Sequence, residues 1–112
     1  MDPVADQISA ARDCGADRIE LYTGPFAHTF AREGANAEAT QAQYRRYANA
    51  AEHAFELGLG LNAGHDLDQA NLVLFREVTG LAEVSIGHAL ISDALEDGLA
   101  PTVANYLAVL RG

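Results

Sequence analysis

Three short polar clusters contain the residues with which this chain could do acid/base chemistry. They are Glu20 with Thr23 and Gly24, Asn62 with His65, and Ser85 with Gly87 and His88. Each cluster lies at the end of a short apolar run of the kind that forms a β-strand. An imidazole exchanges protons near neutral pH, and a carboxylate acts as an acid, a base or a charge stabiliser according to its environment. The clusters therefore predict a site of proton transfer at the ends of strands.

His65 directly follows Ala63 and Gly64, small residues that let a ligand or another backbone come close. At such a strand end its imidazole would suit general acid catalysis. The alternative is that His65 and Asp66 only cap the helix that follows. A metal site is weakly supported, because His65, Asp66 and Asp68 lie within one turn and no matching ligand motif occurs elsewhere. A solvated first helical turn explains the two acids better, so no metal is predicted.

Glu20 lies between Ile19 and Leu21, so strand alternation turns its carboxylate to the face opposite these apolar side chains. If the apolar pair faces helices, Glu20 faces the interior of a barrel, where its environment can tune a carboxylate for electrostatic or acid/base work. The alternatives are a solvated residue at a strand end and an ion pair with Arg18.

Gly87 and His88 precede a helix start, where free backbone N–H groups can hold a phosphate group without any lysine. The alternative is an ordinary strand-to-helix turn with a partly buried histidine. Two other histidines, His28 and His53, have no such neighbours and are interpreted as structural or surface residues. Cys14 lies on the inner face of the first helical pattern and is predicted to be a small buried hydrophobe.

Helical and strand-like patterns alternate along the chain. Helices are predicted over residues 3–14, 38–57, 67–80, 88–98 and 101–112, and strands over residues 16–22, 59–64 and 82–87. Residues 23–36 are predicted to be a long loop, because glycine, proline and asparagine recur there, and such loops are often lids or binding loops. Strands separated by helices of this length imply right-handed crossovers and a parallel sheet.

Composition excludes several classes of protein. With 112 residues, 49% of them hydrophobic and 21% charged, the chain is expected to fold as one domain. Its net charge of −9 argues against general binding to nucleic acid or to anionic membranes. No apolar run approaches the roughly 20 residues of a membrane-spanning helix, and the start lacks a signal-peptide layout, which favours the cytoplasm. The absence of lysine excludes Schiff-base chemistry by this chain.

Three parallel strands are few for an open sheet covered by helices, because both edge strands would need a partner. A chain that begins with a helix and ends with a short helix followed by a long one is typical of the last part of an α/β barrel. The predicted fold is therefore the C-terminal part of a (β/α)₈ TIM barrel, with residues 1–112 as one partial domain. In such barrels a phosphate site often lies beside the last two strands and a short extra helix.

Three segments in this order, IELYTGPFA, LGLNAGHDLDQAN and SIGHALISDAL, resemble the C-terminal half of the pyridoxine 5′-phosphate synthase family, known as PdxJ. The resemblance runs through essentially the whole chain. It implies a barrel enzyme of vitamin B6 biosynthesis that condenses 1-deoxy-D-xylulose 5-phosphate with 3-amino-2-oxopropyl phosphate, closing a pyridine ring and releasing water and phosphate. It also implies that no redox cofactor or metal is needed and that the protein is a homo-oligomer, typically an octamer.

The resemblance implies roles for five residues of this chain. Glu20 matches a glutamate that stabilises the transition state, and His65 matches a histidine that donates a proton during elimination. Asp66, Gly87 and His88 match positions that hold the phosphate of the amine substrate, largely through backbone groups. An aspartate at position 66, where many members of the family have glycine, would need its carboxylate turned away from that phosphate.

Two hypotheses of different classes follow. In the first, the chain is the C-terminal part of a pyridoxine 5′-phosphate synthase and supplies the proton donor and a phosphate site. In the second, it is a non-catalytic half-barrel, a phosphate-binding or assembly module that needs a separate N-terminal half, because the catalytic base histidine and a second glutamate of the family have no counterpart here. An aldolase or epimerase barrel is disfavoured, since those usually use a lysine or a metal cluster.

Overall fold

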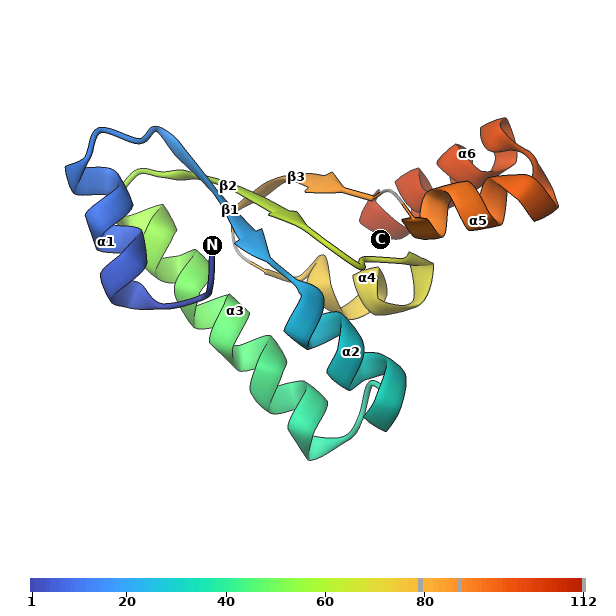
Figure 1. Cartoon of the computed structure of the whole chain (residues 1–112), viewed down its shortest axis with the longest axis horizontal. Helices are drawn as coiled ribbons and strands as arrows, with labels where there is room; N and C mark the ends of the chain where they lie inside the picture. The colour runs from blue at the N-terminus through green and yellow to red at the C-terminus, as the bar shows by residue number, and fades with distance from the viewer. Residues whose placement is uncertain (79, 87, 112) are drawn as a thin grey trace.

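The computed structural model describes residues 1–78, 80–86 and 88–111, and in this part of the chain helices and strands alternate (Figure 1). The elements are α1 (Ala5–Asp13), β1 (Arg18–Tyr22), α2 (Gly24–Glu33), α3 (Glu38–Glu56), β2 (Gly60–Gly64), α4 (Gln69–Phe75), β3 (Leu81–Ser85), α5 (His88–Asp97) and α6 (Leu99–Arg111). The predicted order is confirmed, with one helix added, and the final helix begins two residues earlier than predicted.

The three strands form one parallel sheet in the order β1-β2-β3. Strands β1 and β2 pair in continuous register from Arg18 opposite Gly60 to Tyr22 opposite Gly64. The pairing of β2 with β3 contains a shift between Leu61 and Asn62. The predicted parallel sheet is confirmed, and its strands end together at one edge.

Helices cover one face of this sheet. Strand β1 alternates exposed and buried residues, and its buried side chains, Ile19 and Leu21, share the core with Leu61 and Ala63 of β2. In Figure 1 helices α2, α3 and α4 lie together on one side of the strands. Between them Phe26, Tyr47 and Phe75 form an aromatic cluster. The ring centroid of Phe26 lies 6.2 Å from that of Tyr47 and 5.3 Å from that of Phe75, and the centroids of Tyr47 and Phe75 are 5.6 Å apart. The apolar half of the strand pattern therefore supplies the helix-covered core.

The other face of the sheet is polar. Arg18, Glu20 and Tyr22 are exposed there, and the Arg18 guanidinium donates through Nη1 to Oδ1 of Asn62 at 2.8 Å, across the β1–β2 pair. Glu20 thus points away from Ile19 and Leu21, as its place in the strand predicts. A sheet with one apolar and one polar face has its core on the helix side only.

Helix α2 occupies ten of the residues from 23 to 36, so the prediction of a long loop there is wrong. Helix α2 begins directly after Thr23, with Pro25 in its first turn, and ends at Gly34, whose φ is +89°. Proline is favoured in a first helical turn because its missing N–H would have no partner there. Phe26 and Phe30 lie one turn apart and their rings are in contact. Phe26 belongs to the core and Phe30 packs against it, so both stabilise the helix from its buried side.

The prediction of a buried Cys14 is also wrong. Ile8 is the buried residue of α1, while Cys14 follows the last residue of the helix as its cap and is exposed. Helix α1 packs against α3 and buries Ile8, and its end at Cys14 lies outside the core. Among the described residues no helix is both long and apolar enough to span a membrane.

The outer edge of β1 pairs with the backbone of Met1. The Met1 amino group donates to the carbonyl oxygen of Glu20 at 3.0 Å, and the N–H of Tyr22 donates to the carbonyl oxygen of Met1 at 2.8 Å. One residue bonded to positions on both sides of Leu21 has the hydrogen-bond pattern of a parallel pair. Met1 therefore lies along the outer edge of β1 as one residue of a parallel strand would.

Two buried tyrosines make folding sensitive to alkaline pH. Burial raises the pKa of Tyr47 to about 12, and its hydroxyl donates to the carbonyl oxygen of Tyr22. Burial and the adjacent carboxylate of Asp93, which accepts a hydrogen bond from the hydroxyl at 3.2 Å, raise the pKa of Tyr106 to about 12. The unfolded chain loses both protons near pH 10, so between pH 10 and 12 the folded state binds more protons than the unfolded state.

We expect the free energy of unfolding to fall as the pH rises from 10 to 12, by about 2 to 3 kcal/mol for each of the two tyrosines. The chain contains no lysine, so no ammonium group titrates in this window. Urea unfolding at pH 9, 10, 11 and 12 measures the effect. The double variant Tyr47→Phe, Tyr106→Phe should start less stable but lose less stability with pH, and an unchanged slope in this variant would contradict the assignment.

Candidate active site

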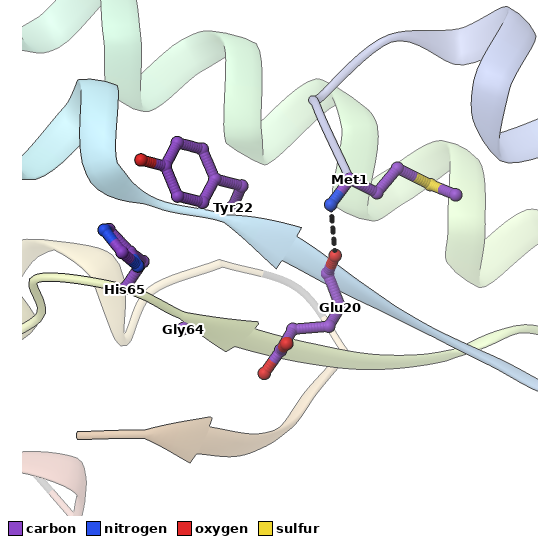
Figure 2. A pocket seen from close by; sticks show the side chains of 5 residues that line it. All are labelled: Met1, Glu20, Tyr22, Gly64 and His65. Atoms are coloured by element: carbon purple, nitrogen blue, oxygen red, sulfur yellow. Dashed lines mark hydrogen bonds between the residues drawn. The ribbon is translucent and has the colours of Figure 1, made fainter. Parts of the chain in front are cut away.

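The carboxyl ends of β1 and β2 enclose a cavity of about 310 Å³ lined by Met1, Glu20, Tyr22, Gly64 and His65. Figure 2 shows that its side chains come from two neighbouring strands and from the start of the chain. Glu20 pairs in register with Asn62, and His65 immediately follows β2. The structure therefore brings Glu20 and His65, both predicted from sequence, to one cavity.

Thr23 ties the ends of the two strands together. Its N–H donates to the carbonyl oxygen of Gly64 at 2.9 Å, and its hydroxyl donates to the carbonyl oxygen of His65 at 2.7 Å. Thr23 is fully buried, so neither bond competes with bulk water. Because Thr23 also precedes the first residue of α2, it fixes the helix and the backbone of His65 to each other.

His65 and Asp66 have a backbone conformation that favours glycine. Their φ angles are +99° and +61°, and they are the two described residues other than glycine with positive φ. Asn71, which is 2% exposed, donates through its side-chain amide to the carbonyl oxygen of Asp66 at 3.2 Å. Residues in such conformations persist where the surroundings hold them and often lie at functional sites.

The turn at His65 and Asp66 lies before the following helix and does not cap it. The cap is Asp68, whose carboxylate accepts from the N–H of Asn71 at 2.8 Å, while the Asn71 side chain accepts from the N–H of Asp68 at 2.9 Å. This reciprocal capping box satisfies the start of α4. The alternative in which His65 and Asp66 only cap a helix is therefore wrong.

The imidazole of His65 packs against the ring of Tyr22. The ring centroids are 4.6 Å apart and the planes are inclined by 43°. Gly24 makes room for this tyrosine, since a Cβ atom there would lie 2.9 Å from Cζ and from the hydroxyl oxygen of Tyr22. Tyr22 thus forms a wall of the cavity, and Figure 2 shows its ring beside that of His65.

The carboxylate of Asp66 lies close to two imidazoles. Its Oδ2 is 3.2 Å from Nε2 of His28 and 3.4 Å from Nε2 of His65. His28 belongs to α2, and its 73% exposed side chain agrees with its interpretation as a surface residue, but its contact with Asp66 was not predicted. The contact of His28 was not predicted because residues 23–36 were interpreted as a loop. Pro25 in a first helical turn, followed by Phe26 and Phe30 one turn apart, could have indicated the helix. The other histidine so interpreted, His53, is half-buried and bonded to the Ser9 hydroxyl at 2.8 Å.

The predicted phosphate-binding pair lies largely beyond what the structure describes. Gly87 is outside the described residues. His88 begins α5, as predicted for a helix start, but its side chain is also outside the described part. Among residues whose side chains are described, no group of three histidine, cysteine, aspartate or glutamate residues is arranged to hold a metal ion. The described site thus offers an imidazole and a carboxylate, the groups needed for proton transfer and charge stabilisation.

Comparison with known proteins gives the family. The model of the family described as pyridoxal phosphate biosynthesis protein PdxJ matches residues 1–112. The chain belongs to the PdxJ family. It is 52% identical over 106 residues to the pyridoxine 5′-phosphate synthase of Xanthomonas oryzae pv. oryzae (strain MAFF 311018), which covers 94% of this chain and 40% of that protein. It is 50% identical over 112 residues to the synthase of Christiangramia forsetii, covering 99% of this chain and 45% of that protein.

The resemblance to the PdxJ family that the three motifs carry is thus confirmed. The chain spans less than half the length of these relatives. The cavity at the ends of β1 and β2 therefore lies in a chain of the PdxJ family.

Replacement of Thr23 by valine tests the connection between the strand ends. Valine keeps the shape but removes the hydroxyl, so the carbonyl of His65 loses a buried donor and the free energy of unfolding should fall by about 1 to 3 kcal/mol. Thr102→Val is a matched control, because Thr102 is also fully buried and its hydroxyl donates at 2.7 Å to the carbonyl oxygen of Gly98, at the start of α6.

Urea unfolding measures the loss in both variants, and NMR chemical shifts show where each one acts. Both variants should lose stability, whereas shifts at His65 should change in Thr23→Val alone. Equal shifts at His65 in both variants would show that Thr23 does not hold this turn.

Proposed function

We propose that this chain is the C-terminal part of the barrel of a pyridoxine 5′-phosphate synthase. In this proposal the complete protein condenses 1-deoxy-D-xylulose 5-phosphate with 3-amino-2-oxopropyl phosphate, and the present chain supplies two groups that take part in the chemistry. His65 donates a proton during elimination, and Glu20 stabilises charge that develops in the transition state. Backbone groups of Asp66, Gly87 and His88 hold the phosphate of the amine substrate.

The observation that carries this proposal is that Glu20 and His65, in a chain of the PdxJ family, line one cavity at the carboxyl ends of parallel strands. Active sites of α/β barrels lie at this end, on residues contributed by several strands. The polar open face of the sheet supports the same assignment, since it would face the interior of a closed barrel. The bond pattern at Met1 supports a further parallel strand beside β1.

Replacement of His65 tests the role of the proton donor. The protein assayed is this chain joined behind the N-terminal segment of the Christiangramia forsetii synthase, which supplies the length that this chain does not match. We expect His65→Asn to lower kcat by about 100-fold to 10,000-fold, the usual contribution of general acid catalysis. Formation of pyridoxine 5′-phosphate from the two substrates is the measurement.

His53→Gln is the control for this test, because His53 bonds to Ser9 between α1 and α3, away from the cavity. The control should keep the activity of the unsubstituted protein. Full activity of the His65→Asn protein would show that His65 is not the proton donor.

A second candidate function is a non-catalytic module that needs a separate N-terminal half. The edge of β1, which already pairs with Met1, and the open face of the sheet favour it. We expect the purified 112-residue chain to form no product alone and to regain activity when the separately expressed N-terminal segment of the relative is added. Turnover by the 112-residue chain alone would exclude a non-catalytic module. If the mixed segments are inactive while the joined protein is active, the two halves must be covalently linked.

A further inference from the structure

The carboxylate of Asp66 is placed to act on the ring of His65. Its Oδ2 lies 3.4 Å from Nε2 of His65 and 3.2 Å from Nε2 of His28, so one carboxylate oxygen is within ion-pair distance of both imidazoles. The Asp66 side chain is 37% exposed, less than either histidine, at 54% for His65 and 73% for His28. The carboxylate is thus the inner member of the three, and the histidines lie toward solvent.

Other contacts leave the ring of His65 little freedom. The ring of Tyr22 packs against it at 4.6 Å, and Thr23 and Gly64 fix its backbone through the bonds at the strand ends. The contact with Tyr22 limits tilting but has no hydrogen-bonding direction. The contact with Asp66 reaches a ring nitrogen of His65.

We propose that Asp66 is a positioning residue for His65, held in place by His28. The inference rests on the proposed function of His65 and deepens it. An oxygen that accepts from Nε2–H fixes the orientation of the ring and the nitrogen that carries the hydrogen, which leaves Nδ1 to exchange a proton with a ligand. When the charged ring gives up its Nδ1 proton, it becomes the neutral tautomer with hydrogen on Nε2, and the carboxylate keeps its partner.

His28 gives the arrangement its second contact. It belongs to α2, whereas Asp66 follows β2, so their contact joins the two connections that leave the strand ends. With an imidazole on two sides, from His28 and from His65, the carboxylate of Asp66 stays oriented toward these rings. The carboxylate of Asp66 is then turned toward the histidines and away from the side of its backbone where a phosphate would bind. An aspartate at this position is compatible with a phosphate only in such an orientation.

The first part of the test uses the 112-residue chain and needs no activity. NMR relaxation of the His65 ring measures its order parameter. We expect Asp66→Gly to lower this value from about 0.85, typical of rigid groups, to below about 0.6. Glycine suits a positive φ, so the variant removes the carboxylate without straining the backbone.

Variants of His28 separate its role from that of Asp66. His28→Gln keeps an N–H donor and should preserve the order of the His65 ring, whereas His28→Leu should reduce it. Glu33→Gln is the matched control, because it removes an exposed ion pair of α2, between Arg32 and Glu33 at 3.2 Å, without touching the site. An unchanged order parameter in Asp66→Gly, with correct folding shown by the amide spectrum, would overturn the proposal.

The second part uses the joined protein. We expect Asp66→Gly to lower kcat by about tenfold to a hundredfold with KM nearly unchanged, because a misoriented proton donor slows the chemical step more than binding. Asp66→Asn keeps an acceptor oxygen and should recover part of kcat. A large rise in KM with unchanged kcat would show that Asp66 only binds substrate.

The two parts fail in different ways. If His65→Asn is fully active, the proposed function of His65 fails, and the relaxation data still decide whether Asp66 orders the ring. If His65→Asn is inactive while Asp66→Gly changes neither kcat nor the ring order, the function stands and the positioning role is wrong.

Discussion

The hydrogen bonds of Thr23 hold the candidate site together. One donor from its backbone and one from its side chain join the end of β1 to the carbonyl groups of Gly64 and His65. Without them the strands would still pair, but the turn after β2 would be joined to α2 by the more exposed contact of His28 with Asp66. The positions of Tyr22, His65 and His28 relative to one another all depend on this connection, since each lies on one of the segments that Thr23 joins.

The sheet explains why the site lies where it does. Its helix-covered face contains Ile19, Leu21 and Leu61, whose burial stabilises the fold, so polar side chains are confined to the other face and to the strand ends. Glu20 can remain in the middle of a strand because it lies on the polar face. A closed barrel would place that face inside, where a carboxylate needs bonded partners.

Much of this arrangement follows from local sequence patterns. Alternation in the strands predicts which way Glu20 points, and the glycine at position 64 predicts an open approach to His65. The pairing of His28 with Asp66 does not follow, because it depends on how α2 leaves the strand. Pro25 was interpreted as a breaker when it marks a helix start. Cys14 was misplaced because α1 ends at Asp13, so that Cys14 caps the helix and does not lie on its buried face.

The backbone at His65 and Asp66 shows how the surroundings support a strained turn. A left-handed conformation costs about 1 to 2 kcal/mol for a residue other than glycine. The two bonds from Thr23 and the one from Asn71 each contribute about 0.5 to 1.5 kcal/mol, which is of the same order as the total cost. The turn is therefore maintained by two buried residues, Thr23 and Asn71, that are not among the residues lining the cavity. A conformation held at this cost directs the imidazole of His65 toward the cavity and the carboxylate of Asp66 toward the histidines, which an extended backbone at these positions would not do.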